Sequence, residues 1–277
     1  MQGQMNKPIT DAVRLSGVTI AFPTARGGVF RAVEDADLSV APGEFVAIVG
    51  PTGCGKSTLL NAAAGLLRPA AGSVTIAGQP LTTLNAAAGY LFQGDGLLPW
   101  KTARQNVALG LELRGTPRAA ATAEAERWLG RVGLAGFGDR WPHQLSGGQR
   151  KRVALAQVLI RDPRILLMDE PFGPLDAQTR LIMGDLLLDL WSADRKAVLF
   201  VTHDLEEAIA LADRVVIMST GPSARIIGDF PITLDRPREI GDVKLTPAFQ
   251  ALHREIWGVL REQVMKAYAP SVTERAS

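Results

Sequence analysis

The sequence predicts an α/β protein built around a mainly parallel β-sheet, and three observations support this. Short runs rich in apolar and β-branched residues end at glycine or polar residues, as strands buried on both faces do. Stretches with helical periodicity alternate with these runs, an order that favours strand–helix–strand units. A glycine-rich segment, 50–58, follows one run directly and precedes a helical pattern. The runs expected to form strands are 44–50, 73–78, 164–169, 197–203 and 214–219.

Helical patterns fill the intervals between these runs. Residues 104–139 are rich in Ala, Glu and Arg and contain no strand pattern, so we expect a helical insert between two halves of an α/β core. From Pro231 onward prolines interrupt the chain, and a helical pattern then covers 247–263, which predicts an appended helix. The other expected helices cover 57–66, 102–132 with a break near 115–117, 147–160, 176–192 and 204–212.

The composition is that of an ordinary globular protein and excludes several classes. The 277 residues are 47% hydrophobic and 21% charged. Thirty basic and 28 acidic residues give a net charge of +2, so we expect no nucleic-acid partner, and the basic cluster at 150–152 is expected to be a solvated helix face. Cys54 is the single cysteine of the sequence, so an internal disulfide is excluded, and this cysteine content fits a reducing compartment. The chain has no signal-like apolar region at its start and no run of about 18 apolar residues, which predicts a cytosolic or peripheral protein.

Residues 50–58, Gly-Pro-Thr-Gly-Cys-Gly-Lys-Ser-Thr, match the G-x-x-x-x-G-K-[ST] pattern of a phosphate-binding (Walker A) loop. The strand before it and the helix after it are the context that this loop needs. Its glycines let backbone N–H groups converge on phosphate oxygens, Lys56 brings a cation, and Ser57 offers a hydroxyl to Mg²⁺. We therefore expect nucleotide binding by Gly50, Pro51, Thr52, Gly53, Cys54, Gly55, Lys56, Ser57 and Thr58.

Cys54 lies inside this loop, and two interpretations of its thiol stay open. It can be an inert small residue that fills space. Alternatively, Lys56 and the helix N-terminus are expected to favour its thiolate and make it reactive.

Two adjacent acids end the strand expected at 164–169. Four apolar residues carry Asp169 to the end of that strand, where its carboxylate can hold Mg²⁺ or the waters of the ion. An acid at this place can also be a helix cap or a solvated turn. Glu170 beside it disfavours that interpretation, because two neighbouring carboxylates repel each other unless a cation or substrate lies there. Glu170 is then free to polarise a water molecule.

His203 follows the strand expected at 197–203. A single histidine at a strand end is more often structural than catalytic. Parallel strands, however, place their C-terminal ends on one ligand-binding edge, so Gly50, Asp169 and His203 are expected to converge there. This favours a contact between His203 and the γ-phosphate.

A second glycine turn, Leu145-Ser146-Gly147-Gly148-Gln149, also leads into a helix whose N-terminus suits an anion. With this motif the chain resembles, from about Leu15 to Ile227, the nucleotide-binding subunits of ABC transporters. The resemblance implies an α/β P-loop ABC-ATPase core with a mainly parallel sheet, an N-terminal antiparallel β portion and a helical subdomain insert. The motifs that carry it, in the order that the family has, are 50–58, Gln93, 145–149, 166–170, Gly173-Pro174-Leu175-Asp176 and His203.

The resemblance also explains why one chain carries two anion sites. It implies that two copies pack head to tail, so that the signature of one closes over the γ-phosphate held by the other, as a two-fold dimer allows. The cofactors implied are ATP and Mg²⁺, with Gln93 joining Ser57 and Asp169 at the metal and reaching the attacking water. Asp176 is implied to couple the two sites. The signature residues implied at the nucleotide are Ser146, Gly147, Gly148 and Gln149.

The family places an aromatic residue that stacks on adenine at Phe22. Phe30 is a nearby competitor for this role, and a core position is the other interpretation of Phe22. Three positions depart from the family pattern: Phe22 is often Tyr, Pro174 stands where Ala is usual, and Gln157 stands where Arg is common. Pro174 stiffens the turn before Asp176. None of the three removes a group that performs the chemistry, so ATPase activity is expected.

Residues 93–115 resemble the importers of nitrate, alkanesulfonates, taurine and related small solutes, and segments 181–191 and 256–262 agree. This branch implies integral-membrane permease subunits as partners and, indirectly, a periplasmic or extracellular solute-binding protein. It also implies a peripheral position on the cytoplasmic face of the inner membrane. The apolar stretch 97–100, which ends at Trp100, is expected either to receive a permease helix in an exposed groove or to belong to the core of the insert.

We expect an ABC ATPase core at 13–92 and 161–230, a Q-loop and helical signature subdomain at 93–160, and a C-terminal helical tail at 231–277. Two other functions stay open. A soluble ABC-family ATPase in a non-transport role predicts tandem cassettes, a coiled-coil insert or zinc-binding cysteines. A different P-loop NTPase, a kinase or GTPase, predicts a lid for an acceptor substrate or a guanine-reading motif. The sequence contains none of these features.

Overall fold

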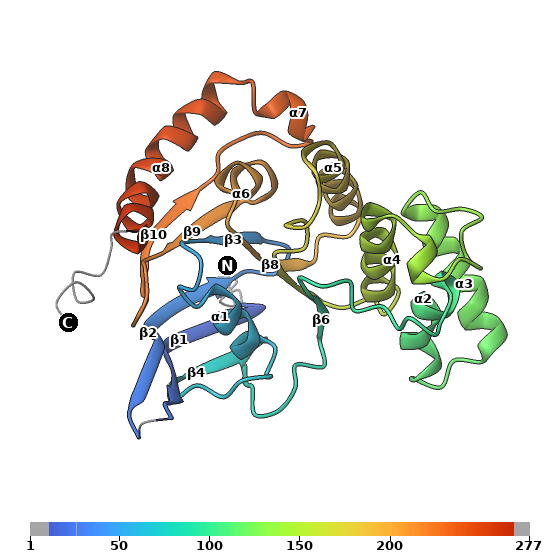
Figure 1. The fold of residues 1–277 in the computed structure, drawn as a ribbon, viewed down its shortest axis with the longest axis horizontal. Coiled ribbons are helices and arrows are strands. Elements are labelled where there is room, and N and C mark those ends of the chain that lie inside the picture. The colour runs from blue at the N-terminus through green and yellow to red at the C-terminus, as the bar shows by residue number, and fades with distance from the viewer. Residues whose placement is uncertain (1–10, 26, 269–277) are drawn as a thin grey trace, which may run out of the picture.

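The fold consists of two β-sheets, helices packed on them and a group of helices at one side (Figure 1). The computed structural model describes residues 11–25 and 27–268. Strands and helices alternate along much of the chain, so the α/β class that the sequence predicts is confirmed. Within the described residues, none of the helices combines the length and the apolar character needed to span a bilayer.

The larger sheet contains six strands: β3 (Phe45–Val49), β6 (Ala88–Leu91), β7 (Ile165–Asp169), β8 (Ala197–Thr202), β9 (Arg214–Met218) and β10 (Ile226–Pro231). Their order is β10-β9-β3-β8-β7-β6, with parallel pairing from β9 to β6 and an antiparallel pair at the β10 edge. Strands β3 and β8 are buried along their whole length, which explains their continuous apolar sequences. Strands β6 and β10 are not expected from the sequence, because β6 is short and β10 is largely half-exposed.

The smaller sheet is antiparallel and contains β1 (Val13–Pro23), β2 (Val29–Val40), β4 (Ala71–Ile76) and β5 (Gln79–Pro80). The strand order is β2-β1-β4-β5, so the N-terminal antiparallel portion is confirmed. One expectation is corrected: the run 73–78 forms β4 of this sheet and is not part of the parallel one. The strand ends at Ile76 because Ala77 and Gly78 take positive φ angles of 47° and 78°, which turn the chain into β5.

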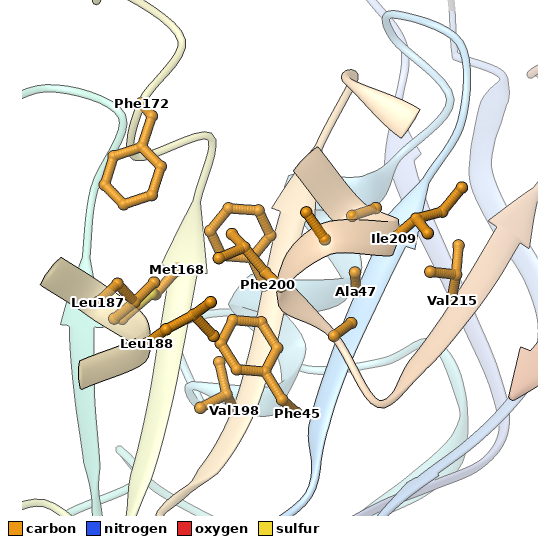
Figure 2. Close-up of a cluster of buried hydrophobic side chains, with 14 of the residues drawn as sticks. Phe45, Ala47, Met168, Phe172, Leu187, Leu188, Val198, Phe200, Ile209 and Val215 are labelled. Atoms are coloured by element: carbon orange, nitrogen blue, oxygen red, sulfur yellow. The ribbon is translucent and has the colours of Figure 1, made fainter. Parts of the chain in front are cut away.

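Helices cover both faces of the larger sheet. Helices α5 (Ala177–Ala193) and α6 (Leu205–Leu211) lie on one face, and α1 (Lys56–Ala63) lies on the other. Successive side chains of β3 point to opposite faces, so Phe45 and Ala47 join the first layer while Val46 and Ile48 join the second. Figure 2 shows the first layer, in which Phe45 and Phe200 of β8 lie beside leucines of α5. This two-sided core fixes the strand ends that carry the site.

The helices at the side of the molecule are α2 (Ala103–Glu112), α3 (Arg118–Arg131), the 3₁₀ turn η1 (Pro142–Gln144) and α4 (Gly147–Leu159). Figure 1 shows them on the right, away from α1. The break expected near 115–117 is present: Gly115 has a φ of 85° and Pro117 stands immediately before α3. The helices share an apolar cluster of their own around Val107, Leu129 and Val153.

The C-terminal tail contains α7 (Ile240–Val243) and α8 (Pro247–Tyr268). The appended helix is therefore present and extends beyond the predicted end at 263. Phe249, Ile256 and Leu260 of α8 are buried in the same apolar layer as α5 and α6. In addition, Gln263 Oε1 accepts a hydrogen bond of 3.2 Å from the backbone N–H of Thr220, just after β9. The tail is thus part of the core and not only a covering element.

Candidate active site

The phosphate-binding loop joins β3 to α1 at the C-terminal edge of the larger sheet. Gly55 precedes the helix with a φ of 95°, and a Cβ atom there would lie 2.7 Å from Val33 Cγ2, so only glycine fits. The buried Lys56 folds back over the loop, where its Nζ donates to the carbonyls of Gly50 at 2.8 Å and Pro51 at 3.0 Å. The first turn of α1 leaves backbone N–H groups without intrahelical partners, which suits an anion.

Cys54 lies in this loop with its thiol turned into the core. Burial raises the pKa of the Cys54 thiol, and the charge of Lys56 opposes this only in part. The expectation that Lys56 and the helix N-terminus favour a thiolate is therefore wrong. The thiol fills the space behind Gly50, where a Cβ atom would approach its sulfur to 2.9 Å.

Two of the three side chains expected to hold Mg²⁺ contact each other directly. Ser57 Oγ, in the first turn of α1, donates to Asp169 Oδ1 at the end of β7 over 2.7 Å. Burial raises the pKa of the Asp169 carboxyl, and the neighbouring Glu170 charge adds to the effect. A hydroxyl beside a buried carboxylate is an all-oxygen donor set of the kind that Mg²⁺ prefers. Within residues 11–25 and 27–268, no group of three His, Cys, Asp or Glu side chains that could hold a metal ion is found, so Ser57 and Asp169 would supply only part of an octahedral shell.

Glu170 and His203 also meet, as the convergence of strand ends predicts. His203 Nδ1 lies 2.9 Å from Glu170 Oε2, and the imidazole is half exposed to solvent. The backbone of Glu170 has a φ of 41°, which is unusual for a residue with a side chain, and its N–H donates to Val201 O at 2.9 Å. A residue held in this conformation at a strand end is typical of a functional position.

Gln93 follows β6 in an exposed segment. Among the described residues, no hydrogen bond joins its side chain to Ser57 or Asp169, so its place at the metal stays a prediction. The backbone carbonyl oxygen of Gln93 accepts a hydrogen bond from Lys151 Nζ at 2.6 Å. Lys151 is only 2% exposed on α4, and burial lowers its pKa. The expected solvated face at 150–152 is therefore wrong for Lys151, which anchors the Gln93 segment to the signature helix.

The signature Leu145–Gln149 forms the start of α4. Ser146 caps the helix, with its Oγ accepting from Gln149 N at 3.2 Å while Gln149 Oε1 accepts from Ser146 N at 2.9 Å. Gly148 lies against α5, where a Cβ atom would come within 2.7 Å of Thr179 Cγ2. Figure 1 shows α4 well apart from α1, so the chain does not bring its signature to its own phosphate-binding loop.

Asp176 caps α5 beside the signature. Its carboxylate accepts from Thr179 N at 2.9 Å and from Thr179 Oγ1 at 2.7 Å, and the backbone N–H bond in particular lowers the pKa of Asp176. The side chain is exposed, as is Pro174 before it. Gln157 lies half-buried on α4, and the structure assigns it no charged partner among the described residues.

Phe22 and Phe30 form a facing pair beside the turn that joins β1 to β2. Both rings are exposed, so the core interpretation of Phe22 is wrong. Two and three residues beyond Phe30, Ala32 and Val33 pack directly on Gly55 of the phosphate-binding loop. Both aromatic side chains therefore remain candidates for stacking on a base.

Comparison with known proteins decides the family. The sequence profile described as "ABC transporter" matches residues 33–173. The chain belongs to the ABC transporter family. A "Taurine import ATP-binding protein TauB" of Mesorhizobium japonicum is 45% identical over 235 residues, 83% of this chain and 91% of that protein. An "Aliphatic sulfonates import ATP-binding protein SsuB" of Albidiferax ferrireducens is 48% identical over 248 residues, 90% of this chain and 84% of that protein.

Solved ABC cassettes share the fold. A dimeric structure of a post-hydrolysis state of the ATP-binding cassette MJ0796, bound to ADP and Pi, superposes with a TM-score of 0.71 at 31% identity. The match covers 80% of this chain and all of that one. The ABC-ATPase fold and the activity of an ATP hydrolase are thereby confirmed, and a P-loop kinase or GTPase with a chance signature is excluded.

The ABC cassette also contains a polar cluster that sequence reasoning missed. Arg180 on α5 contacts Asp204, which caps α6, at 3.0 Å between Nη1 and Oδ2. Glu207 on α6 is buried, and its Oε2 accepts from Thr202 Oγ1, next to His203. Burial raises the pKa of Glu207 from 4.5 to about 7. The sequence signal was weak, because these residues meet only after β8, α5 and α6 pack together.

We expect Glu207 to make the fold less stable as the pH rises. Its pKa is higher in the folded chain than in the unfolded chain, so the folded chain binds the proton more tightly, and this advantage is lost between about pH 4.5 and 7. Between pH 5 and pH 8 the free energy of unfolding of the wild type should fall by about 2 kcal/mol more than that of Glu207→Gln. Denaturant melts at both pH values measure this, with Glu206→Gln on the same helix as the control. Parallel losses in the wild type and Glu207→Gln would contradict it.

The ABC cassette also has a groove between the phosphate-binding loop and the tail. It has a volume of about 590 Å³ and is lined by 50–52, 203–206 and one face of α8. His253 and Trp257 of α8 stack on each other along this face. No local pattern in 247–263 indicates that this helix borders the phosphate-binding loop.

Proposed function

We propose that the chain is the ATP-binding and hydrolysing subunit that powers an importer for a small solute such as nitrate, a sulfonate or taurine. The observation that carries the proposal is the pairing of Ser57 with Asp169 and of Glu170 with His203 on one sheet edge beside the phosphate-binding loop. The names of the taurine and sulfonate relatives favour the importer branch.

In the proposed site, the loop 50–58 binds the ATP phosphates and Phe22 stacks on the adenine. Ser57, Asp169 and Gln93 hold Mg²⁺, which neutralises charge on the phosphate oxygens when bound. Glu170 orients or deprotonates the attacking water. The half-exposed His203, which contacts Glu170, would face the γ-phosphate and hold it in place.

A second copy of the chain would complete each site. Ser146, Gly147, Gly148 and Gln149 form a capped helix N-terminus whose positive end suits the γ-phosphate held by the partner. Asp176 is exposed beside the signature, where it would cross the interface. The separation of α4 from α1 within one chain favours this arrangement (Figure 1), and the dimeric MJ0796 cassette is a solved precedent.

The turn 97–100 is proposed as the docking point for a permease helix. Trp100 is 69% exposed, so the interpretation as core of the insert does not hold for it, whereas Leu97 packs against the core. The buried Asn106 fixes the turn: its Oδ1 accepts from Leu98 N at 2.8 Å, and its Nδ2 donates to the carbonyls of Leu98 and Lys101. A rigidly presented, exposed aromatic residue is a suitable anchor for a partner.

The proposal implies a peripheral protein on the cytoplasmic face of the inner membrane, with a solute-binding protein acting on the other side. It also keeps the division into a core at 13–92 and 161–230, a signature subdomain at 93–160 and a tail at 231–277. The alternative is a soluble ABC ATPase without a transport role.

A deletion strain tests the function. We expect the purified chain to hydrolyse ATP only with Mg²⁺, and loss of the chain to abolish ATP-dependent uptake of taurine, an alkanesulfonate or nitrate. Restoring the chain should restore the uptake, and the chain should then sediment with membranes. Unchanged uptake of all three solutes, with the chain remaining in the soluble fraction, would favour the non-transport alternative.

A further inference from the structure

Arg180 bridges the two loops that carry the proposed catalytic residues. Its Nη2 donates to the carbonyl of Leu175 at 3.1 Å, in the loop that runs from Glu170 to Asp176. Its Nη1 donates to Asp204 Oδ2 at 3.0 Å, directly after His203. One guanidinium therefore contacts the end of the first loop and the start of the second.

Further contacts connect the other end of the first loop to the same segment around His203. At the other end of the first loop, Glu170 contacts His203 through its side chain and Val201 through its backbone N–H. Asp204 is itself fixed, because its Oδ1 accepts from Glu207 N at 3.1 Å and its N–H donates to Thr202 Oγ1 at 3.0 Å. A shift of the Leu175–Asp176 segment would therefore displace Arg180 and Asp204, and with Asp204 the adjacent His203.

The surroundings of Arg180 favour a role in geometry over one in stability. Its side chain is 30% exposed and that of Asp204 is 27% exposed, so water partly screens this ion pair and it contributes less to folding than a fully buried pair would. The two side chains also border a cavity of about 350 Å³ between α5, α6 and α7. Removing the guanidinium would therefore not collapse a packed core.

The bridge needs the shape of arginine. A planar guanidinium presents several N–H donors in a fixed fork, so it holds a carbonyl and a carboxylate at one relative position. A lysine in its place keeps the positive charge, but its ammonium sits on a flexible stem and does not impose that geometry.

We propose that Arg180 is a positioning residue that holds His203 in register with Glu170, and that it transmits movements of the Asp176 loop to His203. This inference rests on the proposed roles of Glu170 and His203 in hydrolysis. Through this link, a partner copy that contacts Asp176 of one chain would change the position of His203 in that same chain.

Steady-state ATPase kinetics of the purified full-length chain test the link. We expect Arg180→Ala to lower kcat by about tenfold or more, because small misplacements of catalytic groups are costly, while KM for ATP changes less than about twofold. Arg180→Lys should have the melting temperature of the wild type, but its kcat should be as low as that of Arg180→Ala. Asp204→Asn retains the cap on α6 but loses the acceptor of Arg180, so it should lower kcat similarly. The double variant should lose no more than the worse single variant.

Arg104→Ala is the matched control, since Arg104 is also 30% exposed and forms ion pairs, but lies in the helical side group. It should leave kcat within about twofold of the wild type. A wild-type kcat in Arg180→Ala, full rescue by Arg180→Lys, or additive losses in the double variant would each overturn the inference. If Glu170→Gln also retained activity, the proposed hydrolytic site itself would be wrong. If Glu170→Gln lost activity while the Arg180 variants kept it, only the proposed role of Arg180 would be wrong.

Discussion

Glu170→Gln should bind ATP and lose turnover by about 10²-fold or more. The substitution keeps the size of the side chain and leaves the loop 50–58 and the Ser57–Asp169 pair untouched, so nucleotide binding should persist. An amide cannot take a proton from the attacking water. The loss should therefore appear in kcat and not in the affinity for ATP.

Single-turnover hydrolysis and nucleotide binding by the purified variant separate these effects. Because ATP remains uncleaved, the variant should also accumulate as a dimer during gel filtration with MgATP. Glu255→Gln, an exposed acid on α8, serves as the control and should behave as the wild type. ATPase activity near the wild-type level in Glu170→Gln would remove Glu170 from the proposed role.

Trp100→Ala should abolish solute uptake while the isolated subunit stays folded and active. The indole is exposed at the tip of a turn and the Asn106 hydrogen bonds that hold the turn remain, so the fold should not depend on it. A protein–protein contact concentrates its free energy in a few anchor residues, so losing Trp100 should cost about 2 kcal/mol or more of permease binding.

Three measurements on Trp100→Ala decide between the possibilities: melting temperature, ATPase rate and recovery with permease-containing membranes. Trp257→Ala, which removes a 40% exposed tryptophan of α8, is the comparison and should still sediment with membranes. If Trp100→Ala unfolds, the side chain is structural. If membrane recovery stays at the wild-type level, Trp100 is not an anchor.

The parts of the site that sequence predicts are those encoded by neighbouring residues. The loop 50–58 and the acids at 169–170 are recognisable because a buried strand, a turn and a helix follow one another in the chain. The parts that it missed depend on packing between distant segments. The burial of Cys54 and Lys151, and the bridge from Arg180 to Asp204, arise only when the layers of the fold come together.

The same distinction applies to the fold. The fully buried strands β3 and β8 are evident from their apolar runs, whereas the short β6 and the half-exposed β10 have no comparable signal. The sequence of β4 does not predict which sheet the strand joins, because an apolar run does not specify whether the neighbouring strand is parallel or antiparallel.

The embedding of α8 limits how the protein can be shortened for expression. A truncation after β10 would remove Phe249, Ile256 and Leu260 and uncover the apolar surface of α6 on which they lie. Such a fragment would expose an apolar surface to solvent and would be prone to aggregate. It would also lack one wall of the groove beside the phosphate-binding loop, so its kinetic behaviour would not represent that of the natural enzyme.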